Sequence, residues 1–591
     1  MQNTWNLEDI YKSPKDEKLA ADCLNVQNLV DSFRTQFKGN ISLNNLKTAI
    51  LLYEEIVCLL DKICAYSCLY VQTRLNDSEA LSFQQEKMEL AYYLNSQLEF
   101  FHNAVSKLNI EEVKVSCEQD KYLEKYGSWI LNFLRYKEHR LSDDFEEAFA
   151  QKLITSNQSW IRMYDEILAL MKFEFHKEEK SLSEILEIAN HSEKDEERAE
   201  ASKALSQKLY EESFYIKHIY NNVILDQSIE NRVRNYEKPE SFRHLYNNIE
   251  QKTVDYLTDS VAKGYERTSH RYYKLKAKIL KKEKLKYWDR NVPVKLSDIL
   301  KRNFDYDTGK RLVLETFGSF SEVFKNIASD FINKRWIDVY PKVGKVSGAF
   351  SHSCSVDVHP YILLNYFDTM ENVSILAHEL GHGIHQTLTA KNGSLLSQTP
   401  ITLAEVASLF SEKLLFEKIF ATARTSEEKI DLLCWKIDGA INSVIRQIAF
   451  FKFERKMHNM RIAKDLSTED LSNIFLETQR ECLGDFVDID DCVGIYWTYI
   501  THFFHSPFYV YAYAFAEIFV NALYMNYKAT GNEFVDKYIN MLSKGGIDRY
   551  DVAAKNFGLD PLKKDFWENG ILFIEEQIEY LEKLYNGKVC C

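Results

Sequence analysis

The chain has 591 residues, of which 45% are hydrophobic and 27% charged, so it contains enough apolar material for a large core. At about 150 residues a domain, this length predicts roughly three or four domains. The formal net charge of −14 argues against general nucleic-acid binding, because neutralising phosphates requires a basic surface. Only 19 Gly and 8 Pro interrupt the chain, so we expect long helices and a mainly α fold.

The ends of the chain and its apolar stretches indicate where the protein resides. The first ten residues, Met1 to Ile10, lack the basic and apolar regions of a signal peptide. The most apolar later stretch, residues 508–525, contains Glu517 and Asn521 and falls short of a membrane span. The eleven Cys show no framework spacing, and the final pair, Cys590–Cys591, does not fit a prenylation signal. We therefore expect a soluble cytoplasmic protein with reduced thiols, no membrane contact and no nucleic-acid partner.

Residues 18–325 form a succession of amphipathic helical patterns, in which apolar side chains recur at three- and four-residue intervals. No repeat or low-complexity linker divides this region, so a domain boundary is expected in a short charged loop. The best candidate begins at His191. We expect an N-terminal helical domain at residues 1–195 and a second domain at residues 196–591.

The pattern changes between Val339 and Asp368. Small residues from Gly344 to Ser351 predict a loop, and residues 356–366 read as one or two short strands, the only convincing β segment of the chain. The helical pattern resumes at Glu371 and continues to the end of the chain. The sequence therefore predicts a small sheet immediately before a long helix.

That helix carries the strongest chemical signal of the sequence. His378 and His382 are four residues apart, so a helix presents both imidazoles on one face, within reach of one tetrahedral metal ion. Glu379 follows the first histidine, where a carboxylate can take a proton from a metal-activated water. This HExxH pattern predicts a zinc-dependent peptidase with Glu379 as its general base.

The third metal ligand must come from elsewhere. The metzincin pattern is excluded, because its third His position is occupied by Leu388. His385 lies one helical turn beyond His382 and is expected to line the cleft rather than to bind the ion. Glu405 is either a ligand or, with Thr402, a helix-capping residue, and its apolar neighbours favour the ligand. Glu412 is the next carboxylate in that segment.

Several motifs together resemble the oligoendopeptidase F branch of the thimet oligopeptidase (M3) family, and the resemblance covers most of the chain. The motifs that carry it are Ala377–His385, Leu403–Ser408, Gly344–Phe350, Pro360–Tyr366, His502–Tyr513 and Asn556–Trp567. The resemblance implies one Zn²⁺ per chain on His378, His382 and Glu405. It also implies a two-lobed helical ellipsoid with a deep channel, in which residues 1–195 form a wall and residues 196–591 the catalytic domain. Short oligopeptides are the implied substrates.

The tyrosine-rich segment has two readings. Alternating Tyr509, Tyr511 and Tyr513 can form an aromatic core stripe, or their phenols can donate to a developing oxyanion. The resemblance implies that His502 and Tyr509 have the catalytic role, with Tyr511 and Tyr513 next in order, and leaves the choice among the tyrosines open.

The expected substrate contacts extend beyond the tyrosine-rich segment. They include an edge strand at Tyr361–Tyr366, to which the substrate main chain would pair. The residues expected to contact the substrate are Gly348, Tyr361, Asn365, His385, Tyr511 and Tyr513.

Two other functions compete with an endopeptidase. A dipeptidyl carboxypeptidase of the same superfamily would differ in gripping the free C-terminus of its substrate. An inactive helical scaffold with a structural metal would have no use for Glu379 beside an open coordination position. Cleavage preference and the choice between monomer and dimer are not readable from the sequence.

Overall fold

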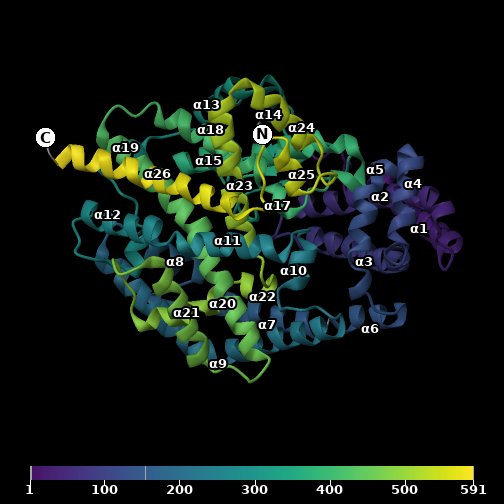
Figure 1. The fold of residues 1–591 in the computed structure, drawn as a ribbon, viewed down its shortest axis with the longest axis horizontal. Helices are drawn as coiled ribbons and strands as arrows, with labels where there is room; N and C mark the ends of the chain where they lie inside the picture. The colour runs from purple at the N-terminus through teal and green to yellow at the C-terminus, as the bar shows by residue number, and fades with distance from the viewer. Residues whose placement is uncertain (1–2, 154, 590–591) are drawn as a thin grey trace. The chain divides into compact units, whose positions relative to one another are not determined.

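The computed structural model describes residues 3–153 and 155–589, and Figure 1 shows that the chain is built almost entirely of helices. The described strands are two or three residues long. The expected mainly α fold is therefore confirmed. The carboxyl-terminal Cys pair lies outside the described residues.

The chain divides into two compact units, and each is assembled from three separate segments. Unit 1 comprises residues 1–140, 301–422 and 523–558, and unit 2 comprises residues 141–300, 423–522 and 559–591. The expected domains, 1–195 and 196–591, do not coincide with these units, because the chain returns repeatedly to each one.

Unit 1 holds the amino-terminal helices and the helix with the HExxH pattern. Its helices are α1 (Glu17–Phe37), α2 (Leu43–Val71), α3 (Ser78–Ser106), α4 (Ile110–Gln119), α5 (Lys121–Leu134), α13 (Tyr306–Phe320), α14 (Glu322–Asn333), α15 (Met370–Thr389), α16 (Ser394–Ser397), α17 (Ile401–Ala404), α18 (Val406–Phe420), α24 (Asn532–Ser543) and α25 (Tyr550–Lys555). Helix α23 (Tyr511–Thr530) begins in unit 2 and ends in unit 1.

Helices α1 to α5 gather as a bundle in Figure 1, and their starts follow from simple capping chemistry. Asp16, Asp77, Asn109 and Asp120 precede α1, α3, α4 and α5, and each side chain accepts a hydrogen bond from a main-chain N–H of the first turn. These bonds satisfy donors that the helix itself leaves unpaired. The apolar faces of the helices then close over an aromatic core that includes Phe33 and Phe101.

Unit 1 also contains a three-stranded sheet in the order β4–β6–β5. Strand β6 (Tyr361–Leu363) pairs in parallel with β4 (Ile337–Asp338) and antiparallel with β5 (Phe350–His352). The sheet packs against α15, so the expected small sheet beside the HExxH helix is confirmed. The expectation that Tyr361–Tyr366 form an edge strand is wrong, because β6 lies between β4 and β5 and both of its sides already carry main-chain partners.

Unit 2 is also helical and holds two very short sheets. One sheet is an antiparallel hairpin of β1 (Phe173–Phe175) and β2 (Glu178–Lys180). The other is a parallel pair of β3 (Leu285–Lys286) and β7 (Val487–Asp488). Both lie outside the one β segment expected from the sequence. Its helices are α6 (Asp143–Leu153), α7 (Asn157–Leu170), α8 (Leu182–His191), α9 (Asp195–Val233), α10 (Ser241–Tyr246), α11 (Gln251–Lys263), α12 (Arg271–Ile279), α19 (Ser426–Ala440), α20 (Arg446–Arg461), α21 (Thr468–Leu483), α22 (His502–His505) and α26 (Lys564–Val589).

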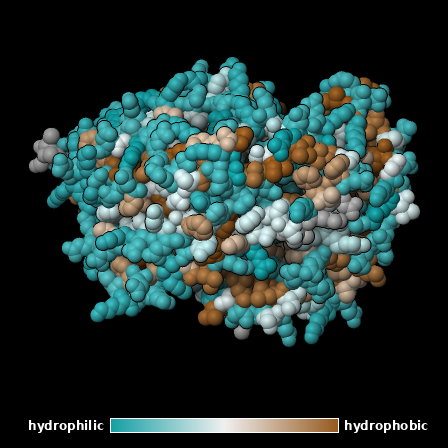
Figure 2. All heavy atoms as spheres, turned by 90° about the horizontal axis from the view of Figure 1, so that it is seen from below, coloured by the Kyte–Doolittle hydropathy of each residue, from teal (hydrophilic) through white to brown (hydrophobic). Residues whose placement is uncertain are grey.

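Within the described residues, no helix combines the length and the apolar character that crossing a membrane requires. Hydrophilic residues cover most of the face that Figure 2 shows, and hydrophobic residues appear there in smaller groups.

Helices α15 and α18 pack at very short range. A Cβ atom added at Gly381 of α15 would lie 2.7 Å from the main-chain oxygen of Ala407 and 2.7 Å from the Cα atom of Ser408. Both atoms belong to the backbone of the segment that begins α18. The clash with an added Cβ atom could therefore not be relieved by the rotation of a side chain. Gly381 is therefore required by packing, although glycine costs about 1 kcal/mol of helix propensity relative to alanine.

The substitution Gly381→Ala is expected to lower the thermal midpoint of the protein. Overpacking against a backbone costs about 1–3 kcal/mol and outweighs the gain in helix propensity. Gly439→Ala in α19 is the matched control, because a Cβ atom there meets nothing within 4 Å and should leave the midpoint unchanged or raise it. Differential scanning calorimetry measures both, and a midpoint for Gly381→Ala at or above the wild-type value would contradict the packing argument.

Candidate metal centre

Helix α15 presents the residues of the HExxH pattern from a firmly buried position. Thr369 caps the helix by accepting a hydrogen bond from the main-chain N–H of Asn372 at 3.2 Å. The apolar face of α15, which includes Val373 and Leu380, is fully buried. This packing turns the opposite face, with His378 and His382, toward Glu405, which lies between α17 and α18.

Glu405 lies at the break between α17 and α18. The side chain of Thr402 does not cap α17, which Pro400 precedes without any side-chain cap. The capping box that the sequence allowed is therefore absent. The Glu405 carboxylate points instead toward the two histidines, and its Oε2 accepts a hydrogen bond from the hydroxyl of Ser408 at 2.9 Å.

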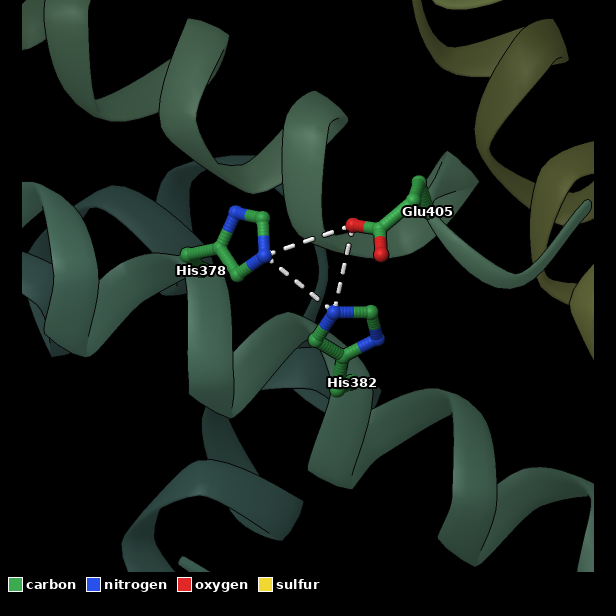
Figure 3. A group of neighbouring side chains, drawn as sticks. All are labelled: His378, His382 and Glu405. Carbon is green, nitrogen blue, oxygen red and sulfur yellow. Dashed lines mark hydrogen bonds and ion pairs between the residues drawn. The ribbon is translucent and has the colours of Figure 1, made fainter. Parts of the chain in front are cut away.

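Three potential ligand atoms form a nearly equilateral triangle (Figure 3). The Nε2 atoms of His378 and His382 are 3.2 Å apart, and each lies 3.3 Å from Oε2 of Glu405. Separations of this size match the distance between neighbouring ligand atoms of a tetrahedral zinc site, about 3.3 Å for bonds of about 2.0–2.1 Å. Two imidazoles and one carboxylate are also a ligand set of catalytic zinc sites. The residues present therefore fit a zinc ion.

The charges of these residues also favour a cation. Burial lowers the pKa of His378, but the Glu405 and Glu412 carboxylates outweigh burial and hold that pKa well above its usual value. Burial opposes the ionisation of Glu405, yet the two histidines hold its pKa far below the usual range. The cluster thus stabilises positive charge at the point where the three ligand atoms converge.

Glu412 orients the first histidine. Its Oε1 lies 2.5 Å from Nδ1 of His378, and its Oε2 lies 3.5 Å from the hydroxyl of Ser374. A carboxylate on Nδ1 fixes the imidazole tautomer that leaves Nε2 free for a metal. In the sequence Glu412 is only the next carboxylate after Glu405, and their separation of seven positions, about two helical turns, is the available signal for a shared face.

Glu379 is buried, with 6% of its surface exposed, and lies next to His378 on α15. Burial raises its pKa, while the two histidines of the cluster act in the opposite direction. A carboxylate with a raised pKa beside a metal site has the properties of a general base that both accepts and returns a proton.

The other expected contact residues in unit 1 have mainly structural partners. The side chain of Tyr361 is fully buried and its hydroxyl donates to the main-chain oxygen of Asn6 at 2.8 Å, so it does not face a substrate. Asn365 donates to the main-chain oxygens of Val346 and Gly348, at 2.9 and 2.8 Å, and fixes the loop before β5. Gly348 has a φ of +83°, which favours glycine.

His385 is outside the group of three potential metal ligands. Burial lowers its pKa to about 4, so this imidazole is neutral at neutral pH. Its Nε2 lies 3.5 Å from the hydroxyl of Thr399.

The aromatic residues of the tyrosine-rich segment separate into two environments within unit 2. Tyr511 is fully buried, and its hydroxyl accepts a hydrogen bond from Asn247 at 2.8 Å, so it is a core residue. His502, Tyr509 and Tyr513 form a cluster, in which Nε2 of His502 lies 3.0 Å from the Tyr513 hydroxyl. The rings of His502 and Tyr509 stack at 5.9 Å.

Comparison with known proteins decides the family. The family model described as peptidase family M3 matches residues 188–572, which is more than half of the chain. The chain belongs to peptidase family M3. A second model, described as oligopeptidase F, matches residues 105–173 of this M3 peptidase. The resemblance found in the sequence is thereby confirmed.

Relatives of this M3 peptidase match it over nearly its whole length. It is 25% identical over 599 residues to oligopeptidase PepF of Bacillus subtilis, covering 99% of this chain and 87% of the relative. It is 26% identical over 593 residues to an oligoendopeptidase F homolog of Borreliella burgdorferi, covering 98% of each.

Solved structures share the fold of this M3 peptidase. A crystal structure from Chlamydophila abortus, of a protein assigned as a peptidase, matches with a TM-score of 0.83 at 22% identity, covering 99% of this chain and 98% of that one. Oligoendopeptidase F of Enterococcus faecium matches with a TM-score of 0.72 at 20% identity, covering 96% and 99%. At these identities the likeness shows the fold alone.

The substitution Glu412→Ala is expected to weaken zinc binding about 10- to 100-fold, because His378 loses the carboxylate that fixes its tautomer and orientation. Glu417→Ala is the control on the same helix, since Glu417 is half exposed and pairs with Lys528. Competition with a chelator of known affinity measures both variants. Equal zinc affinity in Glu412→Ala and in the wild-type protein would contradict the orienting role.

Proposed function

We propose that this M3 peptidase is a zinc-dependent endopeptidase that hydrolyses short oligopeptides. The observation that carries the proposal is the triangle of His378, His382 and Glu405 with the buried Glu379 beside it. Family M3 is in general zinc-dependent, and several relatives are named oligoendopeptidases. One zinc ion per chain is proposed on the three ligand atoms.

Each residue has a defined part in the proposed reaction. A bound zinc ion supplies the Lewis acidity that activates water and polarises a peptide carbonyl. Glu379 accepts the proton of the attacking water on its carboxylate and passes that proton to the leaving amine. Glu412 holds His378 in the tautomer that serves as a ligand.

The proposed oxyanion donors are His502 and Tyr509, as the family resemblance implies. Tyr513 is proposed as a further member of this group of donors, because its hydroxyl lies 3.0 Å from Nε2 of His502. Tyr511 does not belong to it, since its hydroxyl is engaged in the core of unit 2. Residues 1–195 as a channel wall and a cytoplasmic location remain predictions that follow from the sequence and the resemblance.

The substitution Glu379→Gln tests the mechanism. The variant should keep zinc, because its ligands are unchanged, and should lose several orders of magnitude in kcat, because no base accepts the proton of the water. Zinc content by elemental analysis and cleavage of an internally quenched oligopeptide are the two measurements. A second peptide with a blocked C-terminus separates an endopeptidase, which cleaves it, from a dipeptidyl carboxypeptidase. Near-normal turnover of Glu379→Gln would refute the role of Glu379.

The substitution Glu405→Ala tests the ligand set. Loss of one of three ligands should lower both zinc content and activity, whereas the loss of a mere helix cap would cost about 1 kcal/mol of stability and leave the metal in place. Thr402→Ala is the matched control. Thr402 would matter if Glu405 were only a helix-capping residue, but it is not one of the three potential metal ligands, so its loss should leave zinc content unchanged. Full zinc occupancy in Glu405→Ala would remove Glu405 from the ligand set.

A further inference from the structure

A cavity of about 250 Å³ adjoins the metal centre within unit 1. His382, one of the three potential ligands, contributes to its wall. Its volume is below the range of about 300–1,000 Å³ of pockets that hold a whole small-molecule ligand, so it fits a single side chain or a chain end. Other residues that line it include Asp61, Cys354, His385, Gln398 and Thr399.

Asp61, on helix α2, is the only acidic residue among the described residues of the cavity wall, which contains no lysine or arginine. In the described part of the chain it forms no hydrogen bond and no ion pair. Burial raises the pKa of Asp61 to about 7. The neighbouring Lys62 does not compensate it, because the Lys62 ammonium binds Asp357 at 2.7 Å.

An unpaired carboxylate in such a position is costly. Removing a charged group from water without a partner is unfavourable even where, as for Asp61, part of the residue stays exposed, and structural carboxylates therefore generally acquire a cation or hydrogen-bond donors. His385 in the same wall is neutral and supplies no positive charge, and His382 directs its Nε2 atom to Glu405 at 3.3 Å. The Asp61 carboxylate can therefore accept a positively charged group in this cavity, and no described residue provides one.

We propose that this cavity is a substrate subsite in which Asp61 accepts a positively charged nitrogen of the peptide, from a Lys or Arg side chain or from the free amino terminus. The subsite rests on the proposed peptidase function and adds a substrate preference to it. An ion pair in this partly desolvated position discriminates between a cationic peptide and a neutral one of similar shape.

The test uses internally quenched peptides of one sequence. In one series Lys replaces Gln at each position in turn with the amino terminus acetylated, and in a second series the amino terminus is free and no Lys is present. The acetylated Gln peptide is the neutral reference. The zinc-loaded wild-type enzyme is expected to prefer Lys at one position, or the free amino terminus, by about 10- to 100-fold in kcat/KM.

Asp61→Asn keeps the shape of the side chain and removes its charge, and it is expected to reduce this preference ratio to near one. Glu55→Gln is the matched control, because Glu55 is exposed on the same helix and does not line the cavity. Calorimetric binding of the same peptides to Glu379→Gln and to the double variant Asp61→Asn/Glu379→Gln provides a readout without turnover. The cationic peptide should lose affinity in the double variant.

Each outcome has one meaning. Cleavage of the neutral reference without any preference for a cation in the wild-type enzyme would overturn the subsite, and this measurement needs no variant to fold. A preference that Asp61→Asn retains would overturn the role of Asp61. Absence of cleavage of every peptide by the zinc-loaded wild-type enzyme would instead refute the proposed function.

Discussion

The candidate metal centre depends on the close approach of α15 and α18 at Gly381. With no Cβ atom at this position, the backbone at Ala407 and Ser408 comes within van der Waals distance of α15. Glu405 stands immediately before this contact, so the approach of the two helices sets how far its carboxylate extends toward the histidines. A shift of 1 Å would spoil a triangle whose sides are 3.2–3.3 Å, because zinc ligands tolerate only about 0.2 Å.

Charge distribution around the centre follows from this geometry. Two carboxylates, Glu405 and Glu412, face the histidine pair, and a third, Glu379, is buried beside it. The first two are compensated by the imidazoles, as the raised pKa of His378 shows. Asp61 differs from them, because no described group forms a hydrogen bond or an ion pair with it, and we propose that a cation of the substrate does so.

The tyrosine-rich segment shows how one sequence pattern yields two environments. Its alternating aromatic residues read equally well as a core stripe or as a set of donors. Tyr511 packs into the core, while Tyr509 and Tyr513 join His502. Phe508, which precedes the three tyrosines, has a positive φ of 60°, and α23 begins at Tyr511. The core reading therefore holds for Tyr511, while the donor role of Tyr509 and Tyr513 stays a prediction.

The sequence by itself predicts the mainly helical fold, the position of α15 and the shared face of His378 and His382. These features follow from helical periodicity and four-residue spacing, which act between residues close together in the chain. The sequence does not decide whether Glu405 is the third ligand, because its position fits both a helix-capping pattern and a metal-ligand pattern. Short strands escaped notice because two or three residues carry no periodicity, and the hairpin at His176–Lys177 turns through positive φ without Asn or Gly. Four features depend on contacts between segments that are far apart in the chain. They are the central position of β6 in its sheet, the assembly of each unit from three separate segments, the contact of Glu412 with His378, and the absence of a described hydrogen-bond or ion-pair partner for Asp61. Such contacts follow from packing, which local sequence patterns do not encode.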